Sequence, residues 1–300
     1  MANTPSAQPK VQANPQPKKS VPCSHPVCLN LSESLFASIQ ARCARTGETL
    51  DHVIQQSLAE SLGIEHHTMY QVSTANALVQ GVYQGCVTVG HIKQHGDFGL
   101  GTYDALDGEG LMLDGHIWQA KSDGTVVEPP DSTTAPFWVC TQFVADRTET
   151  LASVMSWDDL TAQLDGLRQS QNLFVAFRIE GCFDEIHYRV ACQSNPGTNL
   201  VEATSHQAEF TFQECQGTLM GFWSPSYSRT FNIPGYHLHL LSADHQHGGH
   251  VLGIRAKNLK VQVMNVENVV MALPESPAFL KADLSGDPTK ALSKAEGAKA

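Results

Sequence analysis

Downstream of residue 69 the chain alternates short apolar runs with glycine-containing turns, and this pattern limits the fold more than any other feature. The segments GDFGLG, LDGEG, LDGH and SDG are rich in turn-forming residues. Strand-like runs follow: LFVAFRIEG, AEFTFQ, GTLMGFWS, HLHLL, GHVLGI and LKVQVMNV. WDDLTAQLDGLRQ is typical of a helix, with Ser156 as its N-cap. Because strands and helices do not alternate as in βαβ units, we expect an α+β fold: mostly antiparallel or mixed β-sheets in two packed subdomains, with few helices.

The composition divides the chain into three parts. Residues 1–22 contain mainly Pro, Gln, Ser, Asn and Lys, which predicts a disordered leader with almost nothing to bury. Residues 23–66 predict a short helical N-terminal extension, and residues 67–300 predict a single larger domain. A chain of 300 residues is long enough to bury such a core.

The extension shows apolar residues at helical spacing in two stretches, from Leu35 to Cys43 and from Leu50 to Leu62. Ser32 and Thr49 are expected N-caps, and Gly47 is expected to end the first helix. An extended piece followed by two helices resembles the ribbon-helix-helix modules that bind DNA. Five basic and five acidic residues precede residue 69, however, so we expect a helical pair that packs or dimerises, consistent with a homodimer.

The net charge of the chain is −11, with 19 basic and 30 acidic residues. A negative surface repels phosphate backbones and anionic lipids, so neither nucleic acid nor a membrane is an expected partner. The first twenty residues lack the apolar stretch of a secretory signal, which predicts a cytoplasmic protein. The eight cysteines are scattered and are expected to remain thiols. Cys23, His25 and Cys28 lie close together, but no second ligand pair follows, so they predict no zinc site.

A group of histidines lies in GYHLHLLSADHQHGGHVL, residues 235–252. On a strand, His237 and His239 face the same side and lie roughly 6.6 Å apart along it. If SADHQHGG forms a hairpin loop centred between residues 244 and 245, His250 lies opposite His239 on that same face. Three neutral imidazoles leave coordination positions open on zinc, as catalytic sites do. The alternative is an exposed hairpin that binds metal adventitiously, with His245 and His247 as spare ligands or solvated loop residues.

Several longer motifs occur together with this hairpin. They are HGDFGLGT at 95–102, LDGE at 106–109, GFWSP at 221–225, and PGYHLH with the downstream GGHVL. In this order they resemble the alpha-acetolactate decarboxylase family, over roughly residues 69–297. The resemblance implies a zinc enzyme, a carboxy-lyase that converts 2-acetolactate to acetoin and CO₂ in acetoin and butanediol biosynthesis, without an organic cofactor.

The resemblance also implies roles for individual residues. His237, His239 and His250 fall on the family's three zinc ligands. Glu109 falls on its active-site glutamate, and Arg189 falls on its substrate-binding arginine. Two further matches are Glu296, an acidic residue near the C-terminus that returns to the metal centre, and Thr102, whose backbone lines the substrate pocket.

These residue types suit the reaction. Loss of CO₂ leaves two electrons beside a ketone, and zinc can stabilise the negative charge that develops on the ketone oxygen. A guanidinium such as that of Arg189 can bind the carboxylate through two hydrogen bonds. Glu109 or Glu296 can then return a proton to one face, and the sequence leaves open which of them donates it and which touches the metal.

Two other functions remain open from the sequence. A cupin-like oxygenase or isomerase also carries two histidines one residue apart on a strand, but it usually adds a glutamate shortly after them, which LLSADHQ lacks. The other is a non-enzymatic, DNA-binding regulator with a decarboxylase-like sensor domain, supported by residues 28–64 alone.

Overall fold

A computed structural model describes residues 27–63, 67–195 and 197–296 of the chain. The chain divides into two units, residues 1–30 and residues 31–300. The predicted leader, residues 1–22, lies outside the described residues, and residues 27–30 of the first unit have no helix or strand. The elements described below belong to the second unit.

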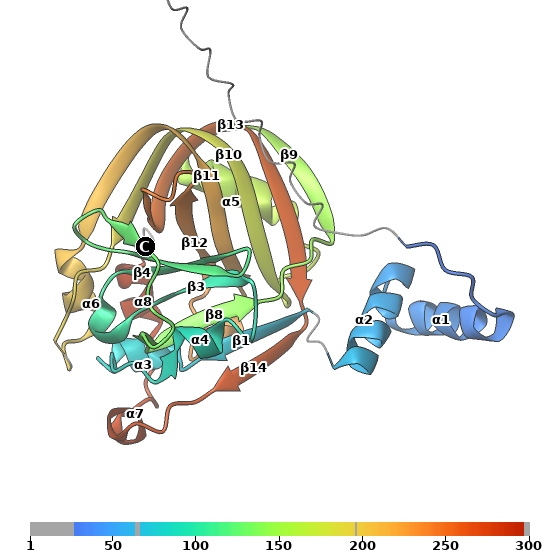
Figure 1. Ribbon diagram of the computed structural model, residues 1–300, viewed down its shortest axis with the longest axis horizontal. Coiled ribbons are helices and arrows are strands. Elements are labelled where there is room, and N and C mark those ends of the chain that lie inside the picture. Colours follow the sequence, from blue (N-terminus) through green and yellow to red (C-terminus); the bar gives the residue numbers. More distant parts are fainter. Residues whose placement is uncertain (1–26, 64–66, 196, 297–300) are drawn as a thin grey trace, which may run out of the picture. The chain divides into compact units, whose positions relative to one another are not determined.

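A seven-stranded mixed sheet contains most of the first half of this unit (Figure 1). Its strand order is β14-β1-β8-β3-β4-β5-β6, in which β1 and β14 are parallel and the other neighbours antiparallel. These strands are β1 (Thr68–Val72), β3 (Phe98–Thr102), β4 (Glu109–Leu113), β5 (His116–Ala120), β6 (Val126–Val127), β8 (Phe137–Thr141) and β14 (Asn268–Ala272). A small antiparallel pair joins β2 (Val87–Thr88) to β7 (Thr134–Ala135).

A five-stranded antiparallel sheet contains most of the second half, in the order β10-β11-β12-β13-β9. Its strands are β9 (Arg147–Val154), β10 (Phe174–Val190), β11 (Ala208–Ser224), β12 (Gly235–Ser242) and β13 (Gly248–Val266). Because β10 pairs with β13 as well as with β11, the sheet curves back on itself, and the long bent strands are visible in Figure 1.

The predicted α+β class with mixed and mainly antiparallel sheets is confirmed. The strand-like runs at 208–213 and 217–224, which the sequence separates, form one strand, β11. A polar stretch divides them in sequence, but its backbone continues to pair with β10 there, and left-handed Glu214 marks the local irregularity. Hydrophobicity predicts where side chains are buried, whereas pairing of the backbone continues through exposed residues as well.

The two sheets share one hydrophobic core. Phe98, Leu100 and Leu111 from the first sheet belong to the same buried cluster as Phe177 and Phe222 from the second. Phe98 and Phe222 contact each other edge to face, with ring centroids 6.1 Å apart. This packing holds β3 and β4 against the sheet that carries the histidines.

Short helices complete the unit. They are α1 (Glu33–Thr46), α2 (Leu50–Leu62), α3 (Ala75–Val79), α4 (Val89–Ile92), α5 (Trp157–Asp165), α6 (Leu200–Ala203), α7 (Pro277–Lys281) and α8 (Thr289–Ala295). The predicted caps are confirmed: the side chains of Ser32, Thr49 and Ser156 each accept a backbone hydrogen bond at the start of a helix, and left-handed Gly47 ends α1. None of the helices in the described residues has the length and apolar composition needed to cross a membrane.

Gly108, immediately before Glu109, provides a test of this architecture. Its φ is +92°, and an added Cβ would lie 2.1 Å from the carbonyl oxygen of Ala120. Gly108→Ala should therefore lower the free energy of unfolding by roughly 3 kcal/mol or more, since both backbone strain and a clash with backbone must be relieved.

Gly115→Ala is the matched control, because Gly115 has a φ of +79° but nothing within 4 Å of its Cβ position. This control should lose only about 1–2 kcal/mol, the cost of the left-handed conformation. Urea denaturation of both variants measures the difference, and equal losses would show that the β4–β5 contact at Gly108 is not rigid.

Candidate metal centre and active site

The hairpin formed by β12 and β13 positions three histidines. His239 is directly opposite His250 in the antiparallel register, and Leu240 is opposite Gly249, as the sequence predicts for a turn centred between residues 244 and 245. The Ser242 hydroxyl closes the loop by accepting hydrogen bonds from two backbone N–H groups, at 3.1 and 2.9 Å. His237 shares the face of His239 because it lies two residues before it on β12.

The three imidazole rings converge on one point. The Nε2 atoms of His237 and His239 are 3.1 Å apart. The ring centroid of His250 lies 4.9 Å from that of His237 and 5.5 Å from that of His239. One nitrogen from each ring can be chosen so that all three lie within 4.8 Å of one another, a spacing at which they could hold a metal ion.

A backbone contact orients the most buried of these rings. His239 is fully buried, and its Nδ1 lies 2.9 Å from the carbonyl oxygen of Gly110. Because a carbonyl can only accept, Nδ1 carries the proton and donates it, which leaves the lone pair of Nε2 directed at the cluster. Metal-binding histidines are commonly oriented by such a second hydrogen bond.

The environment keeps the three imidazoles uncharged. Burial lowers the pKa of His237 to about 3, and the positive charge of Arg189 acts in the same direction. Burial likewise holds the pKa values of His239 and His250 well below the usual range, with neighbouring histidines and Arg189 contributing. Neutral imidazole is the form that coordinates a metal, so no proton has to be displaced near neutral pH.

Two carboxylates and one guanidinium adjoin the histidines. Glu109, at the start of β4, has its Oε2 3.7 Å from Nε2 of His239. Glu296, which caps the C-terminus of α8, has its Oε2 3.5 Å from both Nε2 of His250 and Nη2 of Arg189. Arg189 lies directly opposite His250 where β10 pairs with β13. Four segments far apart in sequence therefore meet in one site.

Burial shapes the two carboxyl groups as well. It raises the pKa of Glu109 to about 7, against the opposing effects of Arg189 and of the hydrogen bond donated by the Ala191 backbone N–H at 3.1 Å. Burial also raises the pKa of Glu296, again opposed by Arg189. The Oε2 atom of Glu296 is buried and accepts no hydrogen bond from any described residue. An unsatisfied carboxylate oxygen beside three neutral imidazoles fits a site built for a cation.

Apart from His239, these groups line a cavity of about 50 Å³. Thr102 lies in its wall, directly opposite Glu109 across β3 and β4, but its hydroxyl donates to the Gly108 carbonyl at 2.8 Å. The other walls are mainly apolar, formed by Leu78, Leu106, Phe137, Ala191, Leu200, Ile233 and Leu292. The structure thus places six of the seven predicted site residues around one cavity with largely apolar walls. The seventh, His239, adjoins it through His237, with the two Nε2 atoms 3.1 Å apart.

Comparison with known proteins agrees with this geometry. The family model for alpha-acetolactate decarboxylase matches residues 69–286. An alpha-acetolactate decarboxylase of Methylococcus capsulatus is 39% identical over 246 residues, which cover 82% of this chain and 95% of that protein. The chain belongs to the alpha-acetolactate decarboxylase family.

Solved structures of the family have the same fold. The crystal structure of alpha-acetolactate decarboxylase from Bacillus subtilis strain 168 superposes with a TM-score of 0.74 at 33% identity, covering 76% of this chain and 99% of that one. A Staphylococcus aureus protein of unknown function, described as similar to alpha-acetolactate decarboxylase, superposes with a TM-score of 0.73 at 29% identity. The match to the family model ends at residue 286, before Glu296, so this residue is placed by the geometry of α8 alone.

Two polar contacts at the site carry no signal in the sequence. The Gln207 side-chain oxygen accepts a hydrogen bond from Nη1 of Arg189 at 2.7 Å, and the Gly110 carbonyl orients His239. Gly110 directly follows Glu109, so its position near the histidines could have been predicted. Strand alternation describes the direction of side chains, however, and does not predict a contact made by a backbone carbonyl. Gln207 precedes β11 in a polar segment that carries no motif.

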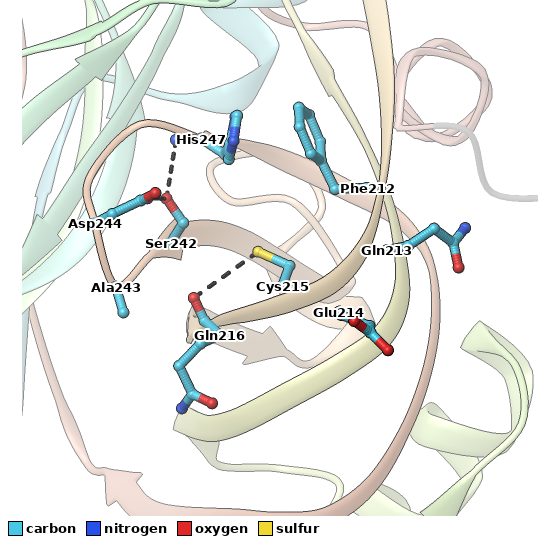
Figure 2. A pocket seen from close by; sticks show the side chains of 9 residues that line it. All are labelled: Phe212, Gln213, Glu214, Cys215, Gln216, Ser242, Ala243, Asp244 and His247. Atoms are coloured by element: carbon cyan, nitrogen blue, oxygen red, sulfur yellow. Dashed lines mark hydrogen bonds between the residues drawn. The ribbon is translucent and has the colours of Figure 1, made fainter.

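His245 and His247 lie away from the three histidines. The ring of His245 contacts Trp118, with centroids 4.7 Å apart, and that of His247 contacts Phe212, at 3.7 Å. Figure 2 shows His247 beside Phe212 at a separate, larger hollow of about 330 Å³ around the hairpin loop. Neither residue is among the described groups that could hold a metal, so they are not spare ligands of the cluster.

His239→Ala should remove one tightly bound metal equivalent per chain, because two remaining imidazoles hold a divalent ion poorly. Elemental analysis after dialysis against zinc measures this loss. His247→Ala, from the same hairpin, is the control and should retain the full content. Equal metal content in the two variants would contradict a centre built on His239.

Proposed function

We propose that this chain decarboxylates 2-acetolactate to acetoin and CO₂, with a zinc ion held by His237, His239 and His250. The observation that carries the proposal is that three neutral imidazoles, two carboxyl groups and one guanidinium meet beside one cavity in a member of this family. A zinc ion bound there would supply Lewis-acid stabilisation of the electrons left on the ketone oxygen when CO₂ departs.

Arg189 is the group that binds and orients the substrate carboxylate. Nη1 is held by Gln207, whereas Nε is buried and has no hydrogen-bond acceptor among the described residues. That N–H can therefore donate to an incoming carboxylate without breaking an existing bond. Pairing with His250 across adjacent strands keeps the guanidinium beside the metal centre. By holding the carboxylate, Arg189 would fix the bond to the departing CO₂ relative to the neighbouring ketone. That ketone receives the electrons of the broken bond, so this orientation favours decarboxylation.

Glu109 is the proton donor. After CO₂ leaves, the carbon that carried it must receive a proton, and a donor works best when its pKa is near the working pH. The pKa of Glu109, about 7, meets this condition. Its Oε1 is held by the Ala191 N–H, and its Oε2 faces the histidine cluster, so one carboxyl group delivers the proton from one side.

Glu296 completes the metal centre from the C-terminal segment. Its Oε2 lies equally close to His250 and to Arg189, 3.5 Å from each. Before substrate binds, the Glu296 carboxylate balances the positive charge of Arg189. After substrate binds, Arg189 interacts with both Glu296 and the substrate carboxylate. The predicted homodimer, cytoplasmic location and role in acetoin and butanediol synthesis remain predictions from the sequence.

The purified protein supplied with zinc should release CO₂ from 2-acetolactate and form acetoin, and Arg189→Ala should reduce kcat/KM by at least about 100-fold, in line with the loss of a charged hydrogen-bonding partner. Colorimetric determination of acetoin measures the rate of product formation by the wild type and by the variant. Metal content serves as the control, since Arg189→Ala should keep its zinc. Acetoin formation at the wild-type rate by this variant would exclude the assigned role, and none by the wild type would exclude the function.

Glu109→Gln should slow turnover and also erase product stereochemistry, because water then delivers the proton from either side. Chiral gas chromatography of the acetoin measures the enantiomeric excess. Glu296→Gln is the matched control: it should also be slower but should still give one enantiomer. A single enantiomer from Glu109→Gln together with a racemate from Glu296→Gln would reverse the two roles.

A further inference from the structure

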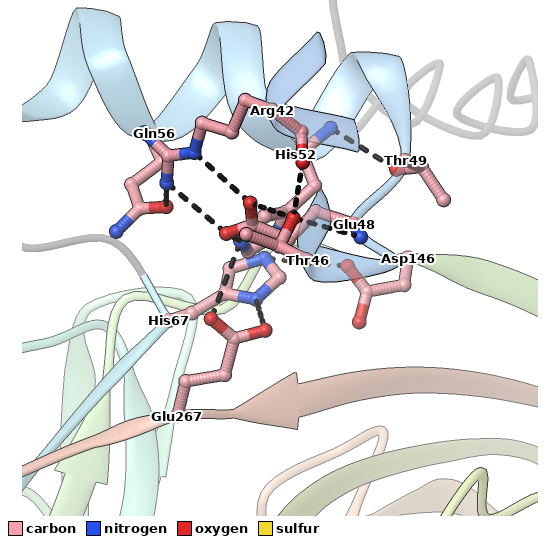
Figure 3. A network of polar contacts seen from close by, with 9 residues as sticks. All are labelled: Arg42, Thr46, Glu48, Thr49, His52, Gln56, His67, Asp146 and Glu267. Carbon is pink, nitrogen blue, oxygen red and sulfur yellow. Dashed lines mark hydrogen bonds and ion pairs between the residues drawn. The ribbon is translucent and has the colours of Figure 1, made fainter. Parts of the chain in front are cut away.

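A second group of potential metal ligands lies outside the active site. His52 from α2, His67 immediately before β1, and Glu267 between β13 and β14 present ligand atoms that all lie within 4.8 Å of one another. Figure 3 shows these three side chains close together, with His52 on the helical segment and Glu267 on the neighbouring strand segment. His52 and His67 precede residue 69, where the match to the family model begins, so two of the three members lie outside the matched residues.

The two histidines are directed at one carboxylate. Nε2 of His52 lies 3.2 Å from Oε2 of Glu267, and Nδ1 of His67 lies 4.0 Å from its Oε1. The rings are edge to face, with centroids 5.0 Å apart. Zinc bonds of about 2.0–2.2 Å hold tetrahedral ligands roughly 3.3–3.6 Å apart. The His52–Glu267 contact, at 3.2 Å, lies just below this spacing, and the His67–Glu267 contact, at 4.0 Å, lies above it.

A second carboxylate orients His67 from behind. Its Nε2 lies 3.2 Å from Oδ1 of Asp146, on the side of the ring opposite to Nδ1. A carboxylate that holds one imidazole nitrogen while the other faces a ligand position is the arrangement that supports metal-binding histidines. His67 is 5% exposed and the side chain of His52 12% exposed, so neither is a loosely solvated surface residue.

Glu48 lies next to His52 but does not belong to the group of three whose ligand atoms lie within 4.8 Å of one another. Its Oε1 lies 3.7 Å from Nε2 of His52, but the same carboxylate accepts hydrogen bonds from Arg42 at 2.9 and 3.0 Å and from Thr46 at 2.6 Å. Because Arg42 already neutralises Glu48, this group adds little charge to the site. Two imidazoles and one carboxylate then leave a fourth position for water, a ligand set that suits zinc.

We propose that His52, His67 and Glu267 bind a second divalent ion of the zinc class, distinct from the one in the active site, which ties helix α2 to the start of β1 and to the β13–β14 connection. The residues come from three separate segments, and residues 64–66 between α2 and His67 lie outside the described part of the chain. A shared ion would cross-link α2, the start of β1 and the β13–β14 connection. The competing explanation is a set of ion pairs that form when the histidines are protonated, with no metal.

Zinc titration of full-length protein in a His239→Ala background tests this proposal independently of the proposed function. With the active-site ligands reduced, one equivalent per chain should still bind, measured by competition with a chromophoric chelator. Adding His52→Gln should lower the affinity for this zinc ion at least about 100-fold. Adding Asp146→Asn should lower the affinity about 10–100-fold, because Asp146 orients His67. Adding His116→Gln, an exposed histidine elsewhere, is the control and should change nothing.

Cobalt substitution and hydrogen exchange give the second readout. Cobalt in the His239→Ala protein should show tetrahedral d–d absorption that His52→Gln abolishes, and zinc should slow amide exchange in α2. Circular dichroism checks that the variants are folded. The second site would be overturned in favour of ion pairs alone if the His239→Ala protein bound no zinc. Equal zinc binding by the folded His52→Gln and His116→Gln proteins would overturn it as well.

Discussion

The pairing of His239 with His250 across the β12–β13 hairpin is the contact on which the rest of the site depends. A shift of one residue in this register would turn every side chain of one strand to the other face and separate the two imidazoles. The hairpin is constrained on both sides, since β12 also pairs with β11, and β13 with β10. The same β10–β13 pairing places Arg189 beside His250, so one register fixes both the metal ligands and the substrate-binding group.

Burial then sets the charge state of each histidine and glutamate in the site. It depresses the pKa values of the three histidines and raises those of Glu109 and Glu296, so neutral forms become favourable in a pocket that also holds a guanidinium. Uncharged imidazoles keep their lone pairs available for a cation, and the raised carboxyl pKa values reduce the negative charge that would oppose an anionic substrate. The apolar walls, such as Phe137 and Ile233, exclude water and thereby strengthen these interactions.

Local sequence patterns sufficed for the parts of the structure governed by local rules. Strand alternation and loop length placed His237, His239 and His250 on one face, and capping chemistry located the starts of α1, α2 and α5. Family resemblance, rather than spacing, drew attention to Arg189, Glu109 and Glu296. Contacts set by packing could not be predicted. Gln207 reaches Arg189 only because β10 and β11 pair along their length, and His67 meets Glu267 only because β1 lies next to β14.

The central claim, that the hairpin brings three imidazoles to one ion, is tested most directly by anomalous diffraction at the zinc edge from crystals of the full-length protein. We predict a peak about 2.0–2.1 Å from one nitrogen of each of His237, His239 and His250, the normal zinc–imidazole bond length. A zinc-soaked crystal with no peak at these histidines, or with a peak bound by the loop residues His245 and His247 instead, would contradict the account.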